Sequence, residues 1–295
     1  MSYRGRFAPS PSGTLHFGSL VAAVASWLDA RRSSGEWLVR IEDVDQPRTV
    51  PGAADAILRA LDALGLHWDG EVVYQSRRTE LYDAALAQLR AGGHTYRCRC
   101  SRREIADSAL HGVEGAIYPG TCRDREVGEA ESAAVRALAP DEAVAFDDRV
   151  QGRITQKVGR DVGDFVLRRR DGLHAYQLAV VVDDAQQGIT DIVRGADLLW
   201  STPRQIVLQR WLGFTTPRYM HLPVAADRSG EKLSKQTNAA AVDIARGVHE
   251  LRRALRFLGQ RDAAGATPRE LLENARRAWE PGLVPRRPAI AVEPA

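Results

Sequence analysis

Lysine is almost absent from this chain, and its few positions point to chemistry. Of the 41 basic residues, only Lys157, Lys232 and Lys235 are lysine. The last two share the segment Lys-Leu-Ser-Lys, which follows a run at 227–230 that carries Ser and Gly. A lysine ammonium is a mobile point charge that can follow a phosphate as it moves, whereas the planar arginine fork suits fixed contacts. The segment therefore predicts a flexible loop that handles phosphate.

A second segment with phosphate-binding features lies far upstream, at residues 9–19 (Pro-Ser-Pro-Ser-Gly-Thr-Leu-His-Phe-Gly-Ser). A turn from a strand into a helix aims backbone N–H groups and the helix dipole at a ligand. Gly13 and Gly18 permit close approach to the backbone, and His16 can donate to a phosphate oxygen. Neither a Walker loop nor a dinucleotide motif is present. An ordinary loop with an exposed histidine is the alternative, but together with the lysine segment the turn predicts an enzyme that cleaves ATP.

The elements around these segments predict a doubly wound α/β sheet. A strand at 3–8, a helix at 19–32 and a strand at 36–41 form its opening unit, and the second strand ends on acidic Glu42. Helices are also expected at 49–64, 78–91, 202–212, 243–258 and 268–279, and strands at 164–168, 175–184 and 189–194. The stretch 175–184 is apolar enough for a buried parallel strand. The Pro-rich segment 281–295 is expected to be disordered.

Composition limits the class of protein. At 295 residues with 44% hydrophobic content, the chain holds one large or two modest domains. No apolar run reaches the length of a membrane span, and no secretory signal is visible at the N-terminus. The net charge is only +3, yet arginine is concentrated in short runs that suit either nucleic acid or solvated helix faces. Three cysteines are too few for a disulfide framework, which favours a cytoplasmic protein.

The cysteines are clustered and suggest a metal site. Cys98, Cys100 and Cys122 lie in one irregular segment together with Tyr118. Thiolates favour Zn²⁺, and a tetrahedral site needs a fourth ligand. His111 is the ordinary candidate for that ligand. The alternative is three buried free thiols.

The two phosphate-binding segments resemble the signatures of the class I aminoacyl-tRNA synthetases, His-Ile-Gly-His and Lys-Met-Ser-Lys-Ser. This chain has His-Phe-Gly-Ser at 16–19 and Lys-Leu-Ser-Lys-Gln at 232–236. The Ser that replaces the second His is a known variation among glutamate-type members. Further segments resemble glutamyl-tRNA synthetase, and together the resemblance covers roughly residues 3 to 240. These segments are 6–13, 40–45, 183–184, 193–197 and 202–205.

The resemblance implies a Rossmann-like class I synthetase catalytic domain with an inserted zinc-bearing α/β subdomain of the acceptor type and a short C-terminal helical segment. The implied limits are 1–93 and 171–240 for the two catalytic halves, 94–170 for the insert, 241–280 for the helices and 281–295 for the tail. In the insert, the resemblance implies an unusual fourth zinc ligand. The implied ligands are Cys98, Cys100, Tyr118 and Cys122.

The resemblance also implies a glutamate pocket. Its residues are Arg6, Ser10, Glu42, Tyr176 and Arg194. Arg194 would pair with the γ-carboxylate through its planar fork, and Glu42 would hold the α-ammonium. Taken from the residues alone, Glu42 is instead a carboxylate that caps a strand end. Arg194 is then a surface residue in an ion pair with Asp191 or Asp197.

The implied chemistry is attack of the glutamate carboxylate on the α-phosphate of ATP, with loss of pyrophosphate. The protein must position the reactants and offset negative charge, and Mg²⁺ would accompany ATP. The implied catalytic residues are His16, Lys232 and Lys235. The implied ATP-binding residues are Pro9, Ser12, Gly13, His16, Gly18, Ser19 and Lys235.

The acceptor is predicted from the C-terminal segment. Only 60 residues follow Lys235, too few for the helical anticodon-reading domains of a glutamyl-tRNA synthetase. The chain thus resembles the truncated glutamyl-Q tRNA(Asp) synthetases. That implies activation of glutamate without tRNA, then transfer to queuosine in the anticodon stem-loop of tRNA(Asp), by a monomer whose arginines contact RNA. The alternatives are a truncated synthetase that charges an acceptor stem, and a non-catalytic RNA-binding paralogue.

Overall fold

The opening strand–helix–strand unit sets the frame of the molecule. In the computed structural model, which describes residues 2–106, 111–112, 115–128, 131–227 and 240–292, β1 (Arg4–Phe7) leads into α1 (Phe17–Arg32) and β2 (Glu36–Ile41). β1 pairs with β2 in parallel. The prediction of these three elements is confirmed.

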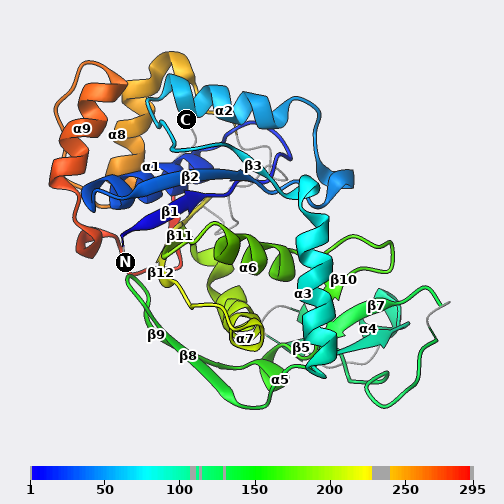
Figure 1. The fold of residues 1–295 in the computed structure, drawn as a ribbon. Coiled ribbons are helices and arrows are strands. Elements are labelled where there is room, and N and C mark those ends of the chain that lie inside the picture. The colour runs from blue at the N-terminus through cyan, green and yellow to red at the C-terminus, as the bar shows by residue number, and fades with distance from the viewer. Residues whose placement is uncertain (1, 107–110, 113–114, 129–130, 228–239, 293–295) are drawn as a thin grey trace.

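A seven-stranded sheet grows on both sides of β1, in the order β3-β2-β1-β11-β12-β8-β9 (Figure 1). Its other strands are β3 (Val73–Tyr74), β8 (Ala143–Asp148), β9 (Gly152–Lys157), β11 (Asp191–Gly195) and β12 (Arg218–Leu222). All strands from β3 to β8 in this order run parallel, and β9 pairs antiparallel with β8. The predicted doubly wound α/β fold is confirmed.

Helices cover both faces of the sheet (Figure 1). They are α2 (Ala53–Ala63), α3 (Thr79–Ala91), α6 (Tyr176–Gln186), α7 (Thr202–Leu212), α8 (Gly247–Phe257) and α9 (Pro268–Ala278). One apolar core joins α1, α2, α8 and α9 to β1 and β2, and includes the fully buried Trp37. A second core joins α3, α6 and α7 to β8 and includes the fully buried Tyr82. Each layer of helices thus has its own core.

The predicted strand at 175–184 is wrong, because this stretch forms helix α6. Every residue from Leu178 to Asp184 is buried, since α6 packs against α3, α7 and β10. A helix enclosed in this way shows no polar stripe. Periodicity therefore cannot distinguish a short buried helix from a buried strand.

A smaller antiparallel sheet, of order β10-β7-β4, lies within the predicted insert. The elements there are β4 (Thr95–Cys98), α4 (Arg102–Ala106), β5 (His111–Gly112), β6 (Gly115–Ala116), β7 (Ala134–Ala137), α5 (Val158–Asp161) and β10 (Val166–Arg168). β8 and β9 also fall inside the predicted limits 94–170, yet β8 pairs with β12 of the main sheet through Asp148 and Tyr219. The limits of the insert stay a prediction.

The expectation of a disordered tail at 281–295 is wrong for residues 289–291. There β14 (Ala289–Ala291) pairs in parallel with β13 (Val224–Ala226). Proline-rich composition suggested disorder, but this strand begins after Pro288, whose carbonyl accepts a hydrogen bond from Val224 N. Short 3₁₀ turns complete the described elements: Gln46–Arg48, Gln75–Arg77, Ala196–Ser201, Ile244–Arg246 and Pro281–Leu283. None of the helices in the described ranges is long and apolar enough to span a membrane.

A buried ionic network ties β2 to α6. Arg40 is 0% exposed and donates to Asp184 Oδ1 at 2.8 Å and to Gln187 Oε1 at 2.7 Å. Arg6 of β1 donates to the same Asp184 oxygen at 3.1 Å. Burial alone would raise the pKa of Asp184, but the two guanidinium groups lower it overall. A buried charge is tolerated when it is paired and hydrogen-bonded, as it is here.

The neighbouring carboxylate extends the network to the start of α3. Asp183 accepts hydrogen bonds from Gln75 Nε2 at 2.8 Å, Arg78 Nε at 2.6 Å and Tyr82 OH at 2.7 Å. The two adjacent aspartates of α6 therefore join three separate parts of the chain: β1, β2 and the segment that leads into α3.

Replacing Arg40 by Met should lower the free energy of unfolding by about 3–5 kcal/mol, because buried carboxylates lose their partner. Urea unfolding followed by circular dichroism measures the change. Arg153→Met is the matched control, because Arg153 and its partner Asp147 are both exposed and such pairs contribute about 0–1 kcal/mol. Equal losses in the two variants would contradict a stabilising role for the network.

Candidate active site

A pocket of about 420 Å³ opens at the carboxyl ends of the central strands. Its walls come from the segments that follow β1, β2, β11 and β12 and from the first turns of α1 and α6. The chain runs outward from β1 to β3 and then returns to β11 on the other side of β1. Ligands bind at such a switch point in open α/β sheets.

The pocket brings together most of the predicted site residues. Those that line it are Arg6, Pro9, Ser10, Ser12, His16, Gly18, Ser19, Glu42, Tyr176 and Arg194. Gly13 lies outside this lining, and its φ of 146° is one that glycine adopts readily, so it serves the turn. Lys232 and Lys235 lie outside the described residues.

His16 caps the helix that faces the pocket. It is the N-cap residue of α1, and its Nδ1 accepts a hydrogen bond from Ser19 N at 3.3 Å. Its Nε2 lies 3.0 Å from Ser19 Oγ. Ser19, which stands where the signature has its second His, thus fixes the imidazole of the first. The first turn of α1 adds the positive end of the helix dipole to this side of the pocket.

Glu42 lies at the end of β2, in the wall of the same pocket as His16. Its side chain is 9% exposed, and its Oε1 accepts a hydrogen bond from Arg40 Nη2 at 3.2 Å. Burial raises the pKa of Glu42, and the guanidinium groups of Arg40 and Arg6 only partly offset that effect. A further cation in the pocket would stabilise the ionised form of this carboxylate.

Arg194 is only 5% exposed, so the alternative of a surface ion pair does not describe it. Asp191, one partner suggested by the sequence, pairs with Arg218 at 2.8 Å instead. Arg194 donates from Nη1 to Tyr176 OH at 3.3 Å and from Nε to His221 Nε2 at 3.0 Å. Its guanidinium is thus held against the wall of the pocket.

The sequence assigned no role to several residues that hold Arg194. Thr202 Oγ1 and Gln205 Oε1 each accept a hydrogen bond from its Nη2 at 2.8 Å. His221 accepts from Nε and is itself bonded to Asp148. Residues 202–205 carried part of the resemblance but were assigned no function.

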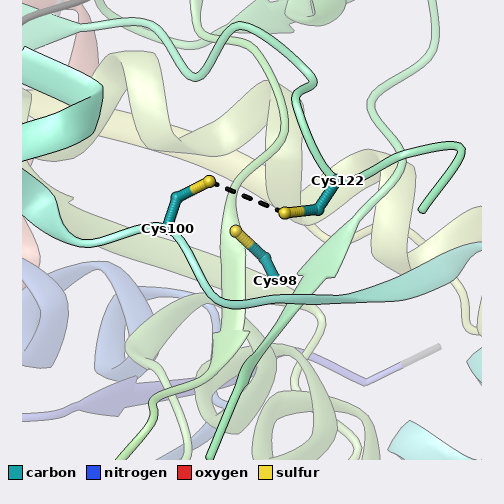
Figure 2. A group of neighbouring side chains, drawn as sticks. All are labelled: Cys98, Cys100 and Cys122. Carbon is teal, nitrogen blue, oxygen red and sulfur yellow. Dashed lines mark hydrogen bonds between the residues drawn. The ribbon is translucent and has the colours of Figure 1, made fainter. Parts of the chain in front are cut away.

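The three cysteines form a second cluster, at the end of β4 of the smaller sheet (Figure 2). Their sulfur atoms all lie within 4.8 Å of one another, and Cys100 Sγ is 3.6 Å from Cys122 Sγ. A tetrahedral zinc with Zn–S bonds of about 2.3 Å requires sulfur separations of about 3.8 Å. The arrangement therefore fits a metal ion.

Tyr118 lies beside the cluster. Its hydroxyl oxygen is 3.6 Å from Cys100 Sγ and accepts a hydrogen bond from Cys122 N at 2.8 Å. Burial alone would raise the pKa of Cys122, but hydrogen bonds, with that from Tyr118 the strongest, lower it to about 7. A thiol that ionises this readily is a good metal ligand. The side chain of His111, the other candidate, lies outside the described part of the structure.

Comparison with known proteins identifies the class. The family described as "tRNA synthetases class I (E and Q), catalytic domain" matches residues 2–275. The chain therefore belongs to this family of class I synthetases, and its predicted assignment to the ligases is confirmed. In solved structures, a glutamate-tRNA synthetase from Elizabethkingia anophelis matches 99% of this chain and 68% of its own, with a TM-score of 0.78 and 23% identity. That likeness confirms the fold.

Curated relatives narrow the assignment. A protein of Dechloromonas aromatica is 64% identical over 260 residues, which cover 88% of this chain and 86% of that protein. One of Pseudomonas entomophila is 54% identical over 292 residues, or 98% of this chain and 96% of the relative. Both are named Glutamyl-Q tRNA(Asp) synthetase. The resemblance inferred from the motifs is confirmed.

Proposed function

We propose that this chain activates glutamate with ATP, without tRNA, and then transfers the glutamyl group to queuosine at the wobble position of tRNA(Asp). One observation carries the proposal: a single pocket joins a helix N-terminus suited to phosphate with a buried cation and a buried carboxylate suited to an amino acid. The names of the relatives specify which acceptor such a pocket would serve.

The amino-acid half of the pocket complements the charges of glutamate. The guanidinium of Arg194 would bind the γ-carboxylate through its Nη1 edge, which lies beside Tyr176 OH, in a charge-assisted hydrogen bond. Glu42 would receive the α-ammonium, which adds a second cation to the one that Arg40 already supplies. Arg6, Ser10 and Tyr176 line the same pocket and would complete the contacts.

The ATP half lies at the turn before α1. His16 and the backbone N–H groups of that turn would hold the phosphates, with Pro9, Ser12, Gly18 and Ser19 in the pocket wall and Gly13 in the turn. Mg²⁺ would arrive with ATP and keep phosphate and water ligands. The glutamate α-carboxylate attacks the α-phosphorus, a glutamyl-adenylate forms, and pyrophosphate leaves. The enzyme contributes position and charge.

Both ends of the lysine-bearing segment are attached beside the ATP half. On one side, β13 contributes Val224 and Ala225 to the pocket wall. On the other, Val242 N donates to Leu15 O at 2.9 Å, and Ala241 forms a bridge with His16. This anchoring supports a role for Lys232 and Lys235 in offsetting the charge that develops on the phosphates.

Lys235→Ala should reduce glutamate-dependent ATP–pyrophosphate exchange by about 10²–10³-fold, because a preorganised charge on the phosphates is lost. Lys157→Ala is the matched control, since Lys157 is exposed on β9 and should leave exchange unchanged. Circular dichroism confirms that both variants fold. Exchange in Lys235→Ala at the rate of the control would remove Lys235 from the mechanism.

The acceptor is tested with radiolabelled glutamate and two preparations of tRNA(Asp), with and without queuosine. Only the modified tRNA should accept label, and nuclease digestion should recover the label in the anticodon fragment, because the ester forms on the cyclopentenediol of queuosine. Label on both tRNAs that is recovered in the 3′-terminal fragment would instead indicate a synthetase that charges the acceptor stem. No label at all, together with no pyrophosphate exchange, would indicate a non-catalytic RNA-binding protein.

The cysteine cluster would hold a structural Zn²⁺ through Cys98, Cys100, Tyr118 and Cys122. The ion would fasten the end of β4 to the segment at 118–122, and free thiols in a reducing cytoplasm suit this use. The limits proposed for the insert that contains it are 94–170, between catalytic halves at 1–93 and 171–240. The chain is proposed to act as a monomer on the anticodon stem-loop.

Purified protein should contain about one zinc per chain by elemental mass spectrometry, and Cys100→Ser should lose most of it, because a tetrahedral site needs all four ligands. Tyr118→Phe tests the phenol as ligand and should release zinc to a chelator faster than the unmodified protein does. Wild-type protein without stoichiometric zinc would refute the metal site. Tyr118→Phe that retains zinc as tightly as wild type would refute only the fourth ligand.

A further inference from the structure

Three buried side chains form a line behind the pocket wall. Arg194 Nε lies 3.0 Å from His221 Nε2, and His221 Nδ1 lies 2.7 Å from Asp148 Oδ2. Arg194 and Asp148 are each 5% exposed, and His221 is 0% exposed. The line begins at the pocket and ends in the protein interior.

The strand order of the sheet creates this line. Arg194 of β11 and His221 of β12 are register partners in a parallel pair, so their side chains lie on the same face. Asp148 ends β8, the next strand along, and pairs with Tyr219. Three neighbouring strands thus carry the three residues across the carboxyl edge of the sheet.

Donor and acceptor roles in this line have only one consistent solution. An arginine Nε always carries a proton, so His221 Nε2 must accept. The imidazole proton therefore sits on Nδ1 and is donated to Asp148. Burial lowers the pKa of His221 to about 4, against the opposing effect of Asp148, so the ring is neutral at neutral pH.

Asp148 is committed to accepting hydrogen bonds. Its Oδ1 accepts from Val150 N at 3.0 Å and from Gln151 N at 2.8 Å, and the backbone N–H of His221 lies 3.1 Å from Oδ2. Burial alone would raise the pKa of Asp148, but hydrogen bonds, led by that from His221, bring it below its ordinary value. An ionised carboxylate can only accept, so it fixes the tautomer of His221.

The tautomer in turn fixes Arg194. Nε is used by His221 and Nη2 by Thr202 and Gln205, while Nη1 bonds to Tyr176, which lines the pocket. A guanidinium held in this way cannot rotate to suit another ligand. Among the described residues, the second Nη1–H is the donor that remains for a ligand. Held in one direction on a buried positive charge, it favours an anionic carboxylate over a neutral amide.

We propose that His221, held in one tautomer by Asp148, is a positioning residue that orients Arg194 and so selects glutamate over glutamine. This inference rests on the proposed function, in which Arg194 binds the γ-carboxylate. Neither His221 nor Asp148 would contact the substrate, and both would act through Arg194.

Asp148→Asn reverses the tautomer while preserving shape. The amide oxygen must occupy the Oδ1 position, because Val150 and Gln151 donate there. The amide nitrogen then faces His221 Nδ1 and forces the ring proton onto Nε2, directly opposite the Nε–H of Arg194. Two donors in contact at a buried site should raise the glutamate KM in pyrophosphate exchange by about 10- to 100-fold. The ATP KM should stay unchanged, and the preference for glutamate over glutamine should fall.

Two further variants separate orientation from general damage. In His221→Gln, the amide oxygen can accept from Arg194 Nε while the amide nitrogen donates to Asp148, so the glutamate KM should stay near that of wild type. Loss of glutamate binding in folded His221→Gln would overturn the inference. Asp147→Asn, at the exposed neighbouring position, is the control and should match wild type.

Nitrogen-15 NMR of the histidine rings tests the arrangement without any catalytic readout. Wild-type His221 should show the Nδ1–H tautomer, and Asp148→Asn should show Nε2–H. An Nε2–H ring in wild type overturns the inference even if no variant folds. So does an unchanged glutamate KM in folded Asp148→Asn. If wild type shows no glutamate-dependent exchange at all, the proposed function fails instead, and the NMR result still decides the tautomer.

Discussion

The buried pair of Arg40 and Asp184 is the constraint on which the amino-acid half of the site depends. It joins β2 to α6 without solvent on either side, and each partner would be costly to bury alone. Glu42 follows Arg40 by two positions on the strand, so it leaves the strand on the same side. Tyr176 precedes Asp184 by two helical turns, so both lie on one face of α6. The pair that holds the two elements together therefore also places Glu42 opposite Tyr176.

Helix α6, which carries Asp184, is also the part of the fold that the sequence did not predict. The turn before α1 and the strand ends were predictable because their signals are local: small residues, a helix start, an acid after an apolar strand. The stretch at 175–184 was misread because burial on all sides removed its helical stripe. Its spacing held a signal nonetheless. Tyr176, Asp183 and Asp184 share one face only on a helix, whereas alternate strand positions would separate the two aspartates.

The residues missed around Arg194 have a different physical cause. Asp148 lies in a segment that the sequence assigned to the insert, and only the strand order brings β8 beside β12 and β11. Such contacts are set by tertiary pairing, which no local pattern encodes. The cysteine cluster is intermediate between these cases. Spacing predicted the three thiols, whereas Tyr118 was implied only by the family resemblance, and its hydroxyl lies 3.6 Å from Cys100 Sγ.

In the proposed function, the two charged ends of the amino acid would be met from opposite sides of the switch point. On the β2 side, the buried network pairs Glu42 with Arg40 and holds its carboxylate in the pocket wall. On the β11 side, hydrogen bonds to His221 and Tyr176 take up the guanidinium donors that would otherwise let Arg194 turn. Because each orienting group is itself buried and hydrogen-bonded, the pocket is preorganised. Ligand binding therefore costs less conformational entropy. Rigidity on both sides of β1 would let the proposed pocket recognise one amino acid by charge and direction together.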